Sequence, residues 1–197
     1  INTFTMETNL TEQQSIKIIQ EMIATSKSKI KDNSFFYLLW GWLVLIASLS
    51  HYFLLRMSFY EYAYLPWPIL MLGGMVVSII AGYRMGKKAK VISHFDNMMI
   101  YLWYGFFFTL MIIIVMSAFQ KIPWVTTHAL IISLYGLGTF VSGGVLRFKP
   151  LIIGGIACWI IAVIAFFVAS ENVLLLTALS IIISYLIPGY ILKSKEN

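Results

Sequence analysis

Two histidines and two acids are the side chains of this sequence with the clearest chemical potential: His51, His128, Glu61 and Glu171. An imidazole changes charge near pH 6.5 and is the commonest metal ligand in proteins, so histidines beside carboxylates could sense acid or hold a metal ion. These four residues are far apart in the sequence and form no short motif, so only the fold could bring them together. The alternative is that each histidine caps a helix end.

Known catalytic and cofactor motifs do not fit this sequence. Gly136-Leu137-Gly138 begins like a dinucleotide-binding loop, but position 141 is valine where the third glycine is required. The sequence has no His-Glu-x-x-His motif and no phosphate-binding loop. Its only cysteine, Cys158, can form neither an internal disulfide nor a cysteine metal cluster. We therefore predict no enzyme activity, no cofactor and no bound metal, with an unrecognised lipid-modifying enzyme as an alternative.

The composition indicates which elements must position these residues. The chain of 197 residues is 60% apolar and 11% charged, whereas soluble domains average about 45–50% apolar and about 25% charged. Six windows carry no charged residue: 33–55, 62–83, 97–120, 122–146, 150–170 and 172–192. Each is long enough for a helix to cross a hydrocarbon core of about 30 Å. An ordinary soluble domain is therefore excluded.

These windows predict an all-α polytopic integral membrane protein. We expect six transmembrane helices, arranged as three two-helix hairpins, at about 35–55, 66–84, 98–119, 125–146, 151–170 and 173–192. The expected domains are a flexible N-terminus (1–10), an amphipathic cytoplasmic helix (11–32), the transmembrane domain (33–192) and a cytoplasmic tail (193–197). Most of the chain would then lie in the membrane.

Positive charge predicts the orientation of these helices, because Lys and Arg are retained on the cytoplasmic side of a membrane. Of the 14 Lys and Arg residues, Arg56 and Lys121 lie on one side. The other twelve lie on the side of both termini: Lys17, Lys27, Lys29, Lys31, Arg84, Lys87, Lys88, Lys90, Arg147, Lys149, Lys193 and Lys195. We therefore expect a multi-pass protein of the cell inner (plasma) membrane with both termini cytoplasmic. The net charge of +6 favours contact with anionic lipid over nucleic acid.

The segment before the first predicted span has the pattern of an amphipathic helix. It begins with a capping box at Thr11, and Ile16, Ile19 and Ile23 recur at helical spacing. We expect its apolar face to bind the inner leaflet, the cytoplasmic end of the bundle or a protein partner. Residues 32–34, Asp-Asn-Ser, predict a turn and a new N-cap, so the first span should begin as a separate helix behind a hinge.

Small residues at every fourth position predict where the helices pack, because close backbone approach drives helix association in lipid. The second and fifth spans each carry such a stripe: Gly74, Ser78, Gly82 and Gly86, and then Gly154, Cys158 and Ala162. These stripes could pack helices of one chain or join two copies. In the sixth span, Pro188 should kink the helix and free the carbonyl of Ser184.

Short sequence patterns shared by the spans indicate a repeated two-helix unit. The odd spans contain Tyr37-Leu38-Leu39-Trp40-Gly41-Trp42, Tyr101-Leu102-Trp103-Tyr104-Gly105-Phe106 and the weaker Leu151-Ile152-Ile153-Gly154-Gly155-Ile156. The even spans contain Gly82-Tyr83-Arg84-Met85, Gly144-Val145-Leu146-Arg147 and Gly189-Tyr190-Ile191-Leu192. Three parallel copies would give threefold pseudo-symmetry.

This arrangement resembles the HdeD-like acid-resistance membrane proteins, which are small six-span chains built from three two-helix repeats. The resemblance covers the six spans and leaves out the N-terminal helix. The aromatic start of the first span also looks like that of uncharacterised bacterial inner-membrane proteins. Both resemblances imply an architecture and no activity.

Three classes of function therefore fit the sequence. The first is a non-enzymatic membrane scaffold or regulatory subunit coupled to a partner through the N-terminal helix, and the others are a carrier or channel for a small uncharged solute and the lipid-modifying enzyme. A polar cavity among the hydroxyl residues of the spans would favour transport, and a dry glycine-packed core would favour the scaffold. The hydroxyl residues are Ser48, Ser78, Thr109, Ser133, Thr139, Ser142, Thr177, Ser180 and Ser184.

Overall fold

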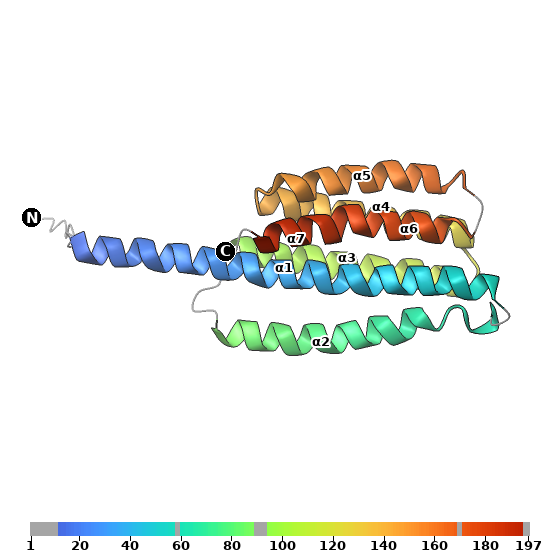
Figure 1. The fold of residues 1–197 in the computed structure, drawn as a ribbon, viewed down its shortest axis with the longest axis horizontal. Helices are drawn as coiled ribbons and strands as arrows, with labels where there is room; N and C mark the ends of the chain where they lie inside the picture. Colours follow the sequence, from blue (N-terminus) through green and yellow to red (C-terminus); the bar gives the residue numbers. More distant parts are fainter. Residues whose placement is uncertain (1–11, 58–59, 89–93, 169–170, 195–197) are drawn as a thin grey trace, which may run out of the picture.

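The computed structural model describes the backbone of residues 12–57, 60–88, 94–168 and 171–194, and the side chains of 34–57, 61–87, 98–168 and 171–194. Within these ranges every regular element is a helix (Figure 1). The elements are α1 (Glu12–Arg56), a 3₁₀-helix (Tyr60–Tyr62), α2 (Pro66–Lys88), α3 (His94–Ala118), α4 (Trp124–Val145), α5 (Lys149–Ala165), α6 (Val173–Ile181), a π-helix (Ile182–Leu186) and α7 (Ile187–Ser194).

Five helical segments are long and apolar enough to cross a membrane: Ser34–Arg56, Pro66–Lys87, Met98–Ala118, Trp124–Val145 and Val173–Ser194. The last joins α6, the π-helix and α7 into one rod. The chain is therefore a helical protein with the apolar segments of a multi-pass membrane protein. The predicted fifth span, 151–170, is shorter than expected because α5 ends at Ala165 and Phe166 and Phe167 form a turn, which leaves a helix of 17 residues.

The predicted break at residues 32–34 does not occur, because α1 continues without interruption from Glu12 to Arg56. Asp, Asn and Ser in a helix interior are disfavoured by less than about 1 kcal/mol each, and no glycine or proline precedes Gly41 in this helix. Its 45 residues extend for about 68 Å. The first predicted span and the predicted cytoplasmic helix are thus one element. The side chains of Ile16, Ile19 and Ile23 lie outside the described residues.

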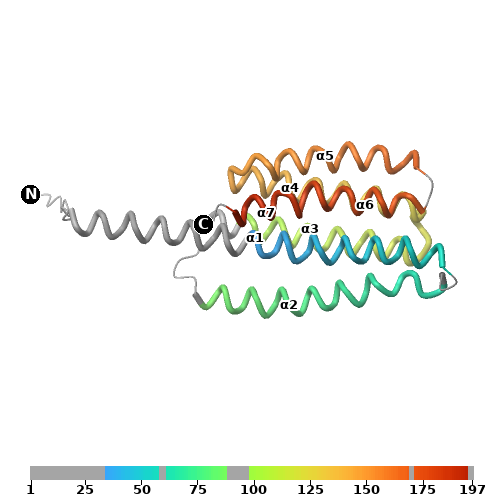
Figure 2. Tube along the Cα trace, in the orientation of Figure 1, coloured from blue at the N-terminus to red at the C-terminus, as the bar shows by residue number. Residues whose placement is uncertain are grey.

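The helices lie side by side along one direction, and their contacts are unevenly distributed (Figures 1 and 2). The closest pair is α4 with α5, while α1 contacts α2 on one side and α6, the π-helix and α7 on the other. α3 contacts α4. If the chain is divided into three consecutive hairpins, α4 contacts α5 between the second and third hairpins, and α6 contacts α1 between the third and first. Between the first and second hairpins, α2 and α3 do not contact each other anywhere in the described ranges. The contacts between consecutive hairpins therefore do not repeat three times.

Close backbone contact holds α4 against α5. A Cβ atom on Gly143 would lie 2.7 Å from the backbone nitrogen of Ile152, and one on Gly155 would lie 2.7 Å from Phe140 and 2.8 Å from the carbonyl oxygen of Gly136. Real Cβ atoms do not approach other atoms so closely. These glycines therefore allow the two helices to touch along their length, which is the packing mode typical of membrane helices.

Candidate functional site

The fold brings His51 and His128 into one group with two tryptophans, at the end of the bundle where α1 ends and α2 and α4 begin. The ring of Trp124 contacts both histidine rings, with centroids 5.1 Å from His51 and 4.4 Å from His128. Trp67 lies 6.0 Å from His128 and donates a hydrogen bond of 2.9 Å from Nε1 to His51 Nδ1. We call these four residues the His–Trp cluster. Both histidines are buried, at 5% and 3% exposure.

Hydrogen bonding determines which nitrogen of each neutral histidine carries the proton. Trp67 can only donate, so His51 Nδ1 accepts and its hydrogen is on Nε2. Thr177 Oγ1 donates to the carbonyl of Val173 at 2.9 Å, so it accepts from His128 Nδ1 at 3.3 Å, and His128 Nε2 keeps a lone pair. The cluster thus presents one N–H donor and one acceptor from opposite rings.

The two acids that the sequence predicts on the same side as these histidines are both exposed. Glu171 pairs with Arg56 at 3.8 Å, and both side chains are more than half exposed. Glu61 is exposed in the 3₁₀-helix. Among the residues whose side chains are described, no group of three His, Cys, Asp or Glu could hold a metal ion. In addition, His51 can offer Nε2 to a metal only if it loses that hydrogen, whereas the lone pair of His128 Nε2 is available.

The hydroxyl residues of the spans are divided between the core and the periphery. Six are fully buried, and five of their hydroxyls donate to backbone carbonyls: Ser48, Thr139, Thr177, Ser180 and Ser184, with Ser142 as the sixth. Only the bond from Ser48, 2.6 Å to the carbonyl of Leu174, joins two helices. Thr109 lies on an exposed face of α3, and Ser78 and Ser133 are half-buried. Most of these hydroxyls are therefore satisfied by the helices themselves.

Three tyrosines from different parts of the chain meet in the core. Tyr185 of the π-helix lies 5.6 Å from Tyr37 of α1 and 5.7 Å from Tyr135 of α4, measured between ring centroids. The hydroxyls of Tyr37 and Ser142 are buried near each other without a well-formed hydrogen bond. A π-helix often marks a functional position in a helix. This tyrosine cluster therefore joins the π-helix to α1 and α4.

The stripe predicted on α2 packs over part of its length. A Cβ atom on Gly74 would collide with Leu43 of α1, so this glycine lies at the α1–α2 contact. Ser78 has a buried hydroxyl without a partner. Gly82 and Gly86 are exposed, and a Cβ atom on either would meet nothing within 4 Å. The second half of the stripe therefore faces away from the described bundle.

The stripe predicted on α5 packs against the last helical rod. A Cβ atom on Gly154 would lie 2.9 Å from Ser184 Cα, and the Cys158 thiol donates to the carbonyl of Ser180 at 3.7 Å. Ala162 is buried. The other glycine of α5, Gly155, packs on α4 as described above. Sequence analysis missed that second seam, whose signals were the adjacent glycines 154 and 155 and the spacing of Gly136 and Gly143.

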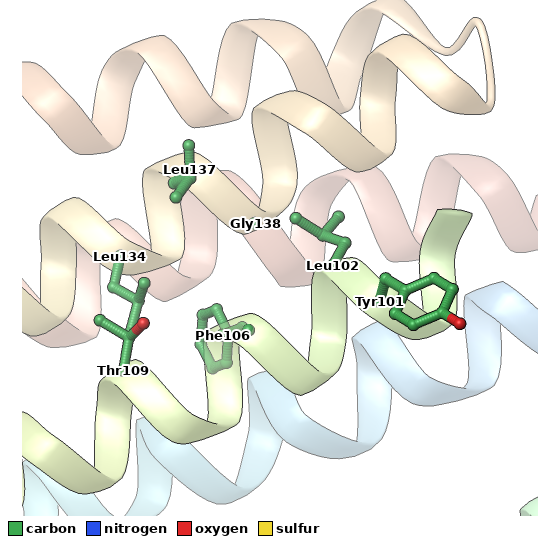
Figure 3. A pocket seen from close by; sticks show the side chains of 8 residues that line it. Tyr101, Leu102, Phe106, Thr109, Leu134, Leu137 and Gly138 are labelled. Atoms are coloured by element: carbon green, nitrogen blue, oxygen red, sulfur yellow. The ribbon is translucent and has the colours of Figure 1, made fainter. Parts of the chain in front are cut away.

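A pocket of about 260 Å³ lies between α3 and α4 (Figure 3). Leu102, Phe106 and Thr109 of α3 are spaced four and three residues apart, so they share one face of that helix. Leu134 and Gly138 of α4 lie opposite them (Figure 3). The remaining lining residues are Tyr101, Gly105 and Leu137. The pocket is apolar and opens on the outer surface of the bundle.

Comparison with protein families, with characterised proteins and with solved structures finds no match for this chain.

Proposed function

We propose that this chain is a non-enzymatic membrane scaffold or regulatory subunit that is coupled to a partner through the N-terminal part of α1. The proposed architecture has six spans in three hairpins, with both termini cytoplasmic. α5, at 17 residues, is about 26 Å long, and a bilayer adapts to a span a few Å short at modest cost.

The continuity of α1 carries this proposal. Because one helix contains both the predicted amphipathic face and the first apolar span, a load on residues 12–33 is transmitted directly to residues 34–56. This span contacts α2, α6, the π-helix and α7, so it links the second helix of the chain to the last ones. The glycine-packed contact of α4 with α5 supplies a firm base. A displacement of α1 caused by binding at its N-terminal part can thus move the helices that it contacts.

The experiment compares charges on the two faces of the N-terminal part of α1 in native membranes. Ile19→Asp with Ile23→Asp places two charges on the apolar face, and the control Thr25→Asp with Ser28→Asp places two charges on the polar face. We expect a partner protein, identified by crosslinking and co-purification with the full chain, to be lost in the first variant and kept in the control. If both variants keep it, the N-terminal part is not the coupling element.

A second pair of substitutions tests the coupling itself. Asp32→Gly with Asn33→Gly lowers helix propensity by less than about 1 kcal/mol at each position and creates a flexible joint. We expect this variant to bind the partner normally and to lose its effect on the partner's activity. Substituting alanine at both positions keeps the helix and should preserve that effect. Equal behaviour of the two variants would contradict the coupling.

A carrier or channel for a small uncharged solute is the second candidate, favoured by the unpartnered hydroxyls of Tyr37 and Ser142 beside the π-helix. Purified protein in liposomes would then admit glycerol faster than protein-free liposomes do. Tyr37→Phe should change that rate. Such a flux would replace the scaffold proposal, and its absence in a correctly folded sample would remove the carrier.

A further inference from the structure

We propose that the pocket between α3 and α4 binds an acyl chain of an anionic phospholipid, whose headgroup lies at the end of the bundle where α3 begins and α4 ends. This site is independent of the proposed partner. Three features support it: the shape of the pocket, its depth in the membrane and the charge of the nearest membrane surface.

The shape follows from two glycines. A Cβ atom on Gly105 of α3 would meet nothing within 4 Å, and the absence of a side chain at Gly138 of α4 admits the ring of Phe106, which would lie 3.2 Å from a Cβ atom there. The space between the helices is therefore lined by hydrocarbon from Leu102, Phe106, Leu134 and Leu137. Because an α-helix with its side chains is about 10–12 Å wide, a partner helix could cover a pocket of 260 Å³ but not enter it. A single acyl chain can enter.

The depth agrees with the position of an acyl chain in one leaflet. Gly138 precedes Arg147 by nine residues, or about 14 Å along a helix. The hydrocarbon part of one leaflet is about 15 Å thick. The acyl chain of a lipid whose headgroup lies at the level of Arg147 therefore reaches the level of Gly138 within one leaflet. Tyr101, 76% exposed, lies on α3 at the rim of the pocket nearer this headgroup level.

The charge of this end selects the headgroup. Arg147 lies just after α4 and Lys149 begins α5, and both are exposed. The sequence places twelve of its 14 Lys and Arg residues on this side against six of its eight Asp and Glu residues, so all of the net charge of +6 lies here. A basic surface of this kind attracts anionic lipid at about 1 kcal/mol per Lys or Arg. The headgroup is therefore that of an acidic phospholipid.

The experiment measures lipid binding to the purified full chain in mild detergent by native mass spectrometry. Phosphatidylglycerol is compared with phosphatidylcholine of the same acyl chains. We expect phosphatidylglycerol to bind more tightly than phosphatidylcholine. Arg147→Gln should weaken the binding of phosphatidylglycerol about fivefold and leave the binding of phosphatidylcholine unchanged. Equal binding of the two lipids by the wild-type chain would overturn the headgroup assignment.

A matched pair of glycine substitutions tests the pocket. Gly105→Leu fills the pocket and should weaken the binding of phosphatidylglycerol about tenfold, which is equivalent to about 1.4 kcal/mol of binding free energy. Gly82→Leu is the control, because Gly82 is also an exposed helical glycine with nothing within 4 Å of a Cβ atom. Phosphatidylglycerol with a photoreactive acyl chain should crosslink to residues 101–109 and 134–138. The proposal would be overturned if phosphatidylglycerol binding fell equally in both variants, or if the crosslinks were confined to other helices. It would also be overturned if a second copy of the chain covered the pocket.

Discussion

Adding one methyl group at Gly143 should destabilise the protein, whereas adding it at the adjacent Gly144 should not. Both glycines lie in α4, so each alanine gains up to about 1 kcal/mol of helix propensity. A Cβ atom at position 143 would lie 2.7 Å from Ile152 nitrogen and 2.9 Å from Leu151 Cβ, whereas one at position 144 would meet nothing within 4 Å. Overpacking of this kind costs about 1–3 kcal/mol. Because the propensity gains cancel, this cost is the expected difference between the two variants.

The single cysteine provides the assay. Cys158 is fully buried, so a thiol-reactive dye labels it only when the bundle opens. We expect Gly143→Ala to be labelled at a lower temperature than Gly144→Ala, by roughly 2–4 °C for each kcal/mol of difference in a chain of this size. Identical labelling temperatures in the same detergent would refute the close contact of α4 with α5, and with it the glycine-packed base of the bundle.

Three further outcomes are expected. An engineered cysteine at Ser58 should react with an impermeant reagent on intact cells while one at Ser194 is protected, and the reverse result would invert the orientation. Ser48→Ala removes the hydrogen bond to Leu174 between α1 and α6 and should lower the labelling temperature by an amount equivalent to about 0.6 kcal/mol, a typical value for such bonds between membrane helices; no change would show that this bond is not stabilising. Deletion of residues 1–31 should leave membrane insertion intact, since each span is inserted by its own apolar length, and failure to insert would contradict this.

The positions of the long apolar helices followed from charge alone, because a charged side chain inside lipid is costly and charges therefore gather at helix ends. The predicted span 125–146 nearly coincides with Trp124–Val145. The end of α5 at Ala165 could not be found in this way, because residues 166–170 are as free of charge as residues 150–165. The continuity of α1 was also missed, because residues 32–34 are residue types common at helix N-caps. Their preference against a helix interior is weak, and the helical segments on both sides outweigh it.

Contacts between helices were harder to predict than the helices. Gly74 and Gly82 look alike in the sequence, yet only Gly74 lies against a neighbouring helix in the described structure. His51 and His128 are 77 positions apart, and their meeting depends on how α1, α2 and α4 are arranged around Trp67 and Trp124. Pro188 was expected to free the carbonyl of Ser184. In the structure the N–H of Ile187 bonds to the carbonyl of Ile182, five residues back, so a π-turn lies directly before this proline.

The contact of α1 with α6 and α7 has a consequence for biosynthesis. α1 leaves the ribosome first and α7 last, and at about 5–20 residues per second the 138 residues between Arg56 and Ser194 take roughly 7–28 s to translate. During that time the surface of α1 that carries Gly41 and Ser48 lacks its contacts with Leu186 and Leu174. A nascent chain that stops before α6 leaves this surface uncovered. Synthesis of the last helices is therefore the step that completes the burial of the first one.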